Sequence, residues 1–93
     1  MRQLALSAVG RDRPGIVAAV SERLLAHKVN IDDSQMAILR GHFAMMLILS
    51  APDGLDLEGL RAGLDEVRGD LALEGMSLSE VDDAPGQIGR AHV

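Results

Sequence analysis

Apolar residues recur along the chain at two different spacings, and each spacing predicts a kind of secondary structure. Residues 2–10 alternate leucine and alanine with other small or apolar residues, which favours a short strand. From Pro14 to His27 the spacing becomes helical, and Pro14 suits the first helical position because its missing N–H is not needed there. The apolar stripe of this expected helix consists of Ile16, Val17, Val20, Leu24 and Leu25.

Two further strands are expected in the middle of the chain. Residues 29–39 have strand character at both ends and an unusually polar stretch between them. Arg40-Gly41 is the expected hairpin turn, since Gly41 is free to adopt a positive φ. Residues 42–50 then form the strongest strand, with apolar side chains on both faces.

A second helix is expected after a turn at residues 51–54. Its apolar residues lie three or four positions apart, at Leu57, Leu60, Leu64, Val67 and Leu71. Asp56 is the candidate N-cap, and Gly69 is the candidate C-terminal stop. Gly59 and Gly63 interrupt the helix at a cost of about 1 kcal/mol each relative to alanine, so tertiary packing must hold it together.

The last strand is expected over residues 72–82, with a bulge near Gly75 because the apolar parity changes there. Residues 83–93 are richer in Asp, Ala, Pro and Gly, which indicates a linker or tail that could lead into a second domain. Over residues 1–82 the order is strand, helix, two strands, helix, strand. This order predicts an α+β, ferredoxin-like βαββαβ sandwich, in which two helices cover one face of a four-stranded antiparallel sheet.

Two helices can cover only one face of such a sheet. Residues 43–49 nevertheless carry large apolar side chains on both sides, and an apolar patch of that size is rarely left in contact with water. The open face is therefore expected to meet a second copy, as a homodimer, or another domain. The alternative is ordinary exposure of a few methionines and alanines.

Composition narrows the class of function. A net charge of -5 with nine scattered basic residues argues against direct binding of nucleic acid. The absence of cysteine fits the cytosol, and no stretch approaches the roughly 18 consecutive apolar residues of a membrane span. His27, His42 and His92 are isolated, and no phosphate-binding, dinucleotide-binding or nucleophile-elbow motif occurs. Neither catalysis nor a metal or other cofactor is expected.

The candidate binding segment runs from Val9 to Val17, where the first strand gives way to the first helix. Gly15 carries no side chain, so a ligand could approach the backbone closely. The exposed N–H groups and the positive dipole end of a helix start would seat a carboxylate or another anion. The alternative is a well-capped turn that Asp12 helps to shape.

The chain resembles an ACT domain in three segments: Asp12-Arg13-Pro14-Gly15-Ile16-Val17, Asn30-Ile31-Asp32-Asp33-Ser34 and Phe43-Ala44-Met45-Met46. More narrowly, residues 3–81 resemble the first of the two ACT domains in proteins similar to the glycine cleavage system transcriptional repressor. Formyltetrahydrofolate deformylases and short single-domain ACT proteins carry a similar module. The resemblance implies a regulatory domain that binds a small molecule, typically an amino acid, at an interface between ACT domains.

The resemblance also implies the ligand-binding residues. The loop after the first strand would contribute Asp12, Pro14, Gly15 and Ile16, and the start of the second strand, expected to face that loop, would contribute Asn30 and Ile31. Asn30 could hold the ammonium group of an amino acid. Asp32 and Asp33 are adjacent in an expected strand, so they should point to opposite faces and form no catalytic pair.

Three functions are compatible with these features. The first is a sensing module that binds an amino acid and regulates a partner protein, in amino-acid or glycine metabolism. The second is a pure association module that binds no ligand. The third is the detached regulatory end of a formyltetrahydrofolate deformylase, whose catalytic residues would lie outside this chain.

Overall fold

The computed structural model describes residues 1–81, which form one sheet and two helices. In chain order the elements are β1 (Arg2–Arg11), α1 (Ile16–Ala26), β2 (Asn30–Leu39), β3 (His42–Ala51), α2 (Leu57–Asp70) and β4 (Gly75–Glu80). The order predicted from the sequence is confirmed. The tail predicted at residues 83–93 lies outside the described residues.

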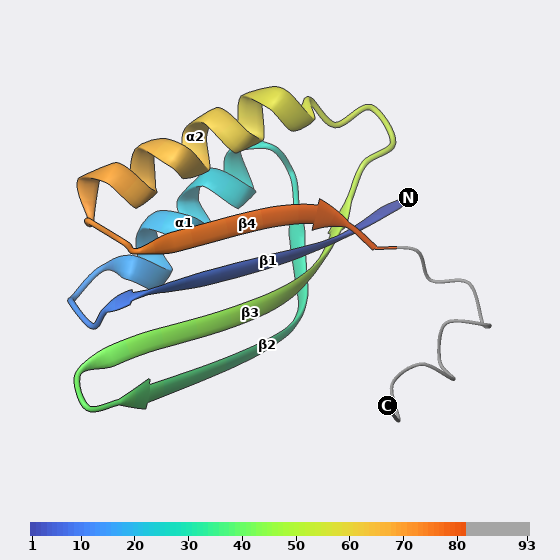
Figure 1. Ribbon diagram of the computed structural model, residues 1–93. Helices are drawn as coiled ribbons and strands as arrows, with labels where there is room; N and C mark the ends of the chain where they lie inside the picture. The colour runs from blue at the N-terminus through green and yellow to red at the C-terminus, as the bar shows by residue number, and fades with distance from the viewer. Residues whose placement is uncertain (82–93) are drawn as a thin grey trace.

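The four strands form a single antiparallel sheet in the order β2-β3-β1-β4. Strands β1 and β3 pair without interruption, from Arg2 opposite Ala51 to Arg11 opposite His42. Both helices lie on the same face of the sheet, and β2 and β4 form its two edges (Figure 1). This is the α+β, ferredoxin-like sandwich that the periodicity predicts.

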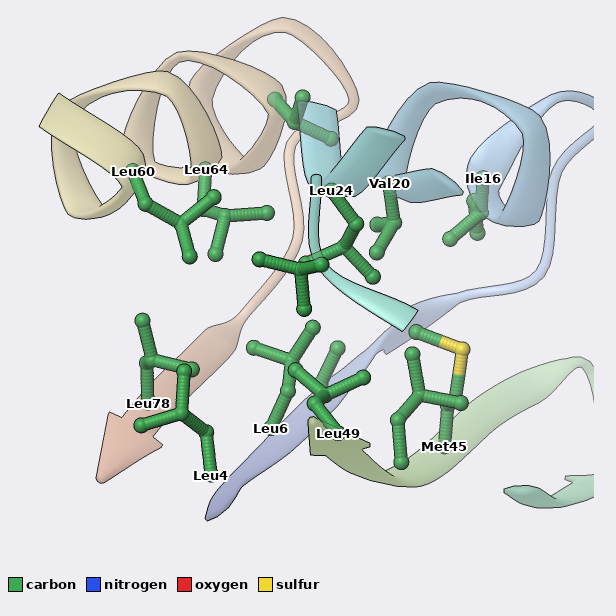
Figure 2. Packing of buried hydrophobic residues seen from close by; sticks show 14 of the residues in the cluster. Leu4, Leu6, Ile16, Val20, Leu24, Met45, Leu49, Leu60, Leu64 and Leu78 are labelled. Carbon is green, nitrogen blue, oxygen red and sulfur yellow. The ribbon is translucent and has the colours of Figure 1, made fainter. Parts of the chain in front are cut away.

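The hydrophobic core lies between the helices and one face of the sheet, where side chains of both layers meet (Figure 2). The central strands contribute alternate residues: Leu4, Leu6 and Ala8 from β1, and Phe43, Met45, Leu47 and Leu49 from β3. The helices contribute Ile16, Val20 and Leu24 from α1, and Leu60, Leu64 and Val67 from α2. Burial of each such aliphatic side chain stabilises the fold by about 1.5–3 kcal/mol, so this layer accounts for most of the cohesion.

Among residues 1–81, no helix covers the other face of the sheet, and this face is only partly apolar. Val9 and Met46 are 45% and 52% exposed there, and Ile48 is half-buried beside them. Ser7 and Ser77 share a side-chain hydrogen bond of 2.8 Å on the same face. The open face is thus a mixed surface of small, polar and apolar side chains. Its association with another sheet stays a prediction.

Helix α1 begins later than predicted. Pro14 does not occupy the first helical position, because the helix starts at Ile16 and its N-cap is Gly15 in the left-handed conformation, with φ 89°. Glycine enters that region without the steric penalty that a Cβ imposes, so the chain turns into the helix at Gly15. Two residues of the predicted apolar stripe, Val17 and Leu25, are 42% and 75% exposed because they lie off the buried face.

The predicted bulge near Gly75 is wrong, since β4 pairs with β1 in an unbroken register. The change of parity has another cause: Leu73 precedes the strand and is buried against Gly10, where an added Cβ would lie 2.8 Å from a Leu73 methyl carbon.

The predicted end of α2 at Gly69 is also displaced. Helix α2 extends one residue beyond it, and the residue with positive φ after the helix is Ala72.

The glycines of α2 have a packing explanation. Gly63 is buried in the seam between the helices, where an added Cβ would lie 3.4 Å from the Arg23 side chain of α1. Gly59 sits against Asp56, whose side chain accepts a hydrogen bond of 3.1 Å from the Gly59 N–H. The predicted N-cap at Asp56 is therefore confirmed.

The hairpin between β2 and β3 has the predicted turn. Arg40 and Gly41 both have positive φ, 53° and 79°, as a two-residue type I′ turn requires. The irregularity in pairing lies in β2, where the register with β3 shifts between Ile31 and Asp33. Asp32 is the extra residue of this bulge.

Candidate functional site

The loop between β1 and α1 gives the helix an open start. An atom added at the Cβ position of Gly15 would meet nothing within 4 Å. No side chain caps the first turn of α1, and that turn contains no acidic residue. The first-turn N–H groups and the positive end of the helix dipole therefore face a space that an anionic group can enter.

The loop is attached to the β2–β3 hairpin. The Asp12 backbone N–H donates a hydrogen bond of 2.9 Å to the Gly41 carbonyl oxygen. Pro14 and Gly15 are exposed, whereas Ile16 is 2% exposed with its side chain in the core. Four predicted site residues are thus brought together at one end of the sheet, and Ile16 offers only its backbone to a ligand.

The other two predicted site residues lie at the opposite end of the sheet. Strand β3 pairs with Arg11 at His42 and with Asn30 at Ser50, eight residues further along. At about 3.3 Å per residue, this separates Asn30 from the end of β1 by about 26 Å. Strands β1 and β2 are both antiparallel to β3 and hence parallel to each other. Within one copy, Asn30 and Ile31 do not face the loop.

Asn30 belongs to a hydrogen-bonded group around Asp32. The Asn30 side-chain N–H donates to one Asp32 carboxylate oxygen at 2.8 Å, and the Ser50 hydroxyl donates to the other. The hydrogen bond from Ser50, and then that from Asn30, lowers the pKa of Asp32 below its ordinary value. Because its N–H group is turned toward Asp32, the Asn30 side-chain oxygen is the atom suited to accept from an ammonium group.

The bulge also changes the faces of the two aspartates. Asp33 pairs with Ile48, and the Asp32 carboxylate bonds to Ser50, which lies two residues further along β3 and thus on the same face. The prediction that Asp32 and Asp33 point to opposite faces is therefore wrong, because the extra residue breaks the strict alternation. Asp33 bonds locally, accepting from the Ser34 backbone N–H at 2.8 Å.

An apolar ledge along the β2 edge was not predicted as part of a site. All ten residues of β2 are exposed, including Met36 and Ile38, at 51% and 59%, which pair with buried core residues of β3. Val17 of α1 is 42% exposed and lies on the flank away from α2. We call Val17, Met36 and Ile38 the β2 ledge. Its apolar spacing in the sequence is that of a core strand, and only the layout of the layers shows that the helices stop short of it (Figure 1).

The described residues present several groups that can bind a small molecule. Among residues 1–81, no three His, Asp or Glu side chains come close enough together to hold a metal ion. Neither of the two helices described in that range is long and apolar enough to span a bilayer. The loop and β2 present backbone N–H groups, an amide oxygen and apolar side chains, a set suited to recognition of a small polar molecule.

A βαββαβ order with strand order β2-β3-β1-β4 and both helices on one face of the sheet is that of the ferredoxin-like class. Within that class, the model of the ACT domain family matches residues 2–76. The chain therefore belongs to the ACT domain family. ACT domains are regulatory domains, which commonly bind amino acids and associate with other ACT domains.

UPF0237 proteins are similar to this chain in sequence. One from Listeria monocytogenes is 36% identical over 73 residues, which are 78% of this chain and 75% of the relative. Another, from Methanopyrus kandleri, is 41% identical over 49 residues, which are 53% of this chain and 54% of the relative. The matched region thus spans about half of the Methanopyrus protein.

Several solved structures share this fold. An ACT domain protein from Streptococcus pneumoniae superposes with a TM-score of 0.73 at 28% identity, over 85% of this chain and 89% of that one. A formyltetrahydrofolate deformylase from Pseudomonas putida matches with a TM-score of 0.71 at 26% identity, over 86% of this chain but only 28% of the enzyme. A proposed glycine cleavage system transcriptional repressor shares the fold, with a TM-score of 0.78 at 23% identity, over 90% of this chain and 48% of that chain.

Proposed function

We propose that this chain is a regulatory ACT module that binds a small amino acid at a seam between two copies and thereby controls a partner protein of amino-acid metabolism. The observation that carries the proposal is the open start of α1 at Gly15, in a chain of the ACT family. The uncapped N–H groups there are the natural partners of a ligand carboxylate.

The seam is proposed at the β2 edge. If two copies pair through β2 around a two-fold axis, the strands run antiparallel, and the first residue of one β2 lies near the last residue of the other. Leu39, the last residue of β2, adjoins the hairpin that holds Asp12. Association of this kind moves Asn30 and Ile31 of a second copy to the loop of the first. The 26 Å gap within one copy is thereby removed.

The two halves suit a zwitterion. The helix start favours the ligand carboxylate. A backbone carbonyl at the start of β2 of the second copy can accept from the ligand ammonium group, since the Asn30 and Asp32 side chains bond at Ser50 on the face away from the helices. The β2 ledge would border the ligand between them and supply apolar surface for a small side chain. Regulation follows by mass action, because a ligand that bridges two copies stabilises their association.

A second candidate is an association module without a ligand. The exposed apolar residues of the β2 ledge, together with Val9 and Met46 on the open face, support this candidate because they need no ligand to be covered. The third candidate, a detached regulatory end of a formyltetrahydrofolate deformylase, draws only on the partial match to such enzymes.

The proposal is tested by thermal unfolding in the presence of a panel of amino acids. A ligand at 100 times its dissociation constant should raise the free energy of unfolding by about 2.7 kcal/mol, which shifts Tm by roughly 10–20 °C in a domain of this size. Gly15→Asp brings a carboxylate to the proposed seat and should abolish the shift. Gly15→Asn is the matched control, since both residues tolerate the left-handed conformation but asparagine carries no charge.

Two outcomes would contradict this function. If no amino acid shifts Tm while the protein still self-associates in sedimentation, the chain is an association module. If Gly15→Asp and Gly15→Asn retain equal shifts, the ligand binds away from the start of α1.

A further inference from the structure

A groove lies between α2 and the outer edge of β4, the edge strand on the side of the sheet opposite to β2. It has a volume of about 400 Å³. Its rim is formed by one flank of α2, with Glu58, Arg61, Asp65 and Arg68, and its floor includes Met76 and Leu78 of β4. In Figure 1, α2 runs above β4 along its whole length. We call this surface the α2–β4 groove.

The edge of β4 is short, with six residues, but it lacks several other features that keep an edge strand from pairing. Strand β4 (Gly75–Glu80) contains no proline or lysine, and its pairing with β1 is unbroken by a bulge. Its outer backbone groups have no strand beside them in the described part of the chain.

The charges on the rim of the groove have a self-complementary order. Along α2 they read negative, positive, negative, positive, at Glu58, Arg61, Asp65 and Arg68. When two such helices lie antiparallel, the first position of one faces the last of the other, and the second faces the third. Every acid is then placed opposite an arginine of the second copy, and no like charges are opposed. Asp65 and Arg68 also bond each other at 2.9 Å within each copy. The centre of this arrangement is Gly63.

The helix and the strand share the same centre. The 14 residues of α2 and the six residues of β4 each span about 20 Å, at about 1.5 and 3.3 Å per residue. The two elements run antiparallel and are joined by a short connection, so the middle of α2 lies over the middle of β4. One two-fold axis can therefore pair β4 with β4 and oppose α2 to α2.

We propose that the α2–β4 groove is a second association surface, whose occupant is another copy of this chain docked around that two-fold axis. The two β4 edges pair antiparallel and extend the sheet, while the two α2 helices lie side by side across the groove. Met76 of both copies, which is only partly buried, is then covered, and the rim charges face each other between copies; Leu78 is already in the core. Glu80 adds no unpaired acid at the end of the strand, because its carboxylate already bonds Arg2 at 2.9 Å.

This surface is independent of the proposed amino-acid seam. Strands β2 and β4 lie at opposite edges of the sheet, so each association can form without the other. An amino acid bound at the β2 edge would then link dimers that have already formed through their β4 edges. The β4 association is expected to persist in Ile38→Glu, a change confined to the β2 ledge.

Sedimentation of charge variants tests the proposal. Asp65→Arg opposes two arginines across the axis and should weaken the β4 association at least tenfold, which lowers the average mass. The double change Arg61→Glu with Asp65→Arg restores opposite charges between copies and should restore the mass. Glu22→Arg makes the same change of charge at an exposed position of α1 and is the matched control. Circular dichroism of each variant verifies that the fold is intact.

Each remaining outcome counts against the surface. If folded Asp65→Arg sediments like the parent protein in the Ile38→Glu background, the groove is not an interface. If the double variant stays as weak as the single one, the rim charges do not pair around a two-fold axis. Raising NaCl from 0.1 to 1 M shortens the screening length from about 10 to about 3 Å, and an association that depends on these exposed charges must weaken over that range.

Discussion

Asp32 is the extra residue in the bulge of β2, and its carboxylate collects hydrogen bonds from Ser50 and Asn30. The polar run that contains it gives no sign of this arrangement in the sequence, since a bulge depends on how two strands align. The consequence is chemical as well as geometric. Hydrogen bonds to the ionised form lower the pKa of Asp32, so its charge is retained below the range in which an isolated aspartate becomes protonated.

This lowered pKa predicts a dependence of stability on pH. A carboxyl whose pKa is lower in the folded than in the unfolded state contributes its full stabilisation above the unfolded value of about 3.9. The contribution is lost as pH falls through the folded value. Asp32→Asn should therefore reduce the drop in Tm between pH 7 and pH 3, measured by thermal unfolding. Ser50→Ala, which removes the first donor, should act in the same direction.

Other carboxyls set the remainder of the acid response. The hydrogen bond from Arg2 lowers the pKa of Glu80, and the amino terminus lowers that of Asp53. The drop in Tm at low pH should therefore shrink in Asp32→Asn without vanishing. An unchanged drop would mean that the Asp32 hydrogen bonds are equally strong in the protonated protein.

At the scale of single elements, α2 depends on its cap and its packing more than on intrinsic propensity. Two glycines in its 14 residues reduce its propensity, but Gly63 admits the Arg23 side chain, and Arg23 forms an ion pair of 2.8 Å with Glu66. The cap at Asp56 was readable from the sequence because it precedes a strict helical pattern. The start of α1 was displaced, since a glycine and a proline are adjacent there and only the left-handed φ of Gly15 selects between them.

The cap of α2 can be tested directly. Asp56→Ala removes the acceptor for the Gly59 N–H and should lower the free energy of unfolding by about 1 kcal/mol, as N-cap deletions commonly do. Asp56→Asn keeps a side-chain oxygen at the same place and should cost much less. Urea denaturation gives both values. Equal losses in the two variants would show that charge, and not the hydrogen bond, supports this helix start.

At the scale of the whole molecule, the helices cover one face of the sheet and stop short of β2. This leaves two apolar regions outside the core, the β2 ledge and the open-face residues Val9 and Met46. The β2 ledge combines apolar side chains with an unpaired strand edge, whereas the open face mixes apolar side chains with serines. The ledge is therefore the stronger candidate for the amino-acid seam.

Two glutamate variants separate these regions. Ile38→Glu places a charge on the β2 ledge and should lower the sedimenting mass and abolish the Tm shift by an amino acid. Met46→Glu places the same charge on the open face and should leave the Tm shift intact, although it weakens any association through that face. Loss of the Tm shift in Met46→Glu alone, with both variants folded, would move the ligand seam from the edge to the open face.

The candidate site was only half predictable. The loop residues Asp12 to Ile16 are contiguous, and the glycine beside a helix pattern marks them without any coordinates. Asn30 and Ile31 entered through the resemblance to ACT domains, and the parallel direction of β1 and β2 places them at the far end of the same copy. A site that is completed by a second copy cannot be located from the periodicity of one chain.

The sequence by itself determined the order of the elements, because hydrophobic periodicity and turn chemistry are local and predict an apolar stripe for each helix and strand. Three of its segments also carried the resemblance to the ACT family. Only the tertiary structure decided where those stripes end: that β2 lies outside the core, that Asp32 forms a bulge and that β4 presents an open edge under α2. These features depend on strand register and on the extent of the helix layer over the sheet. Both are set by contacts between residues far apart in the chain, which no local pattern encodes.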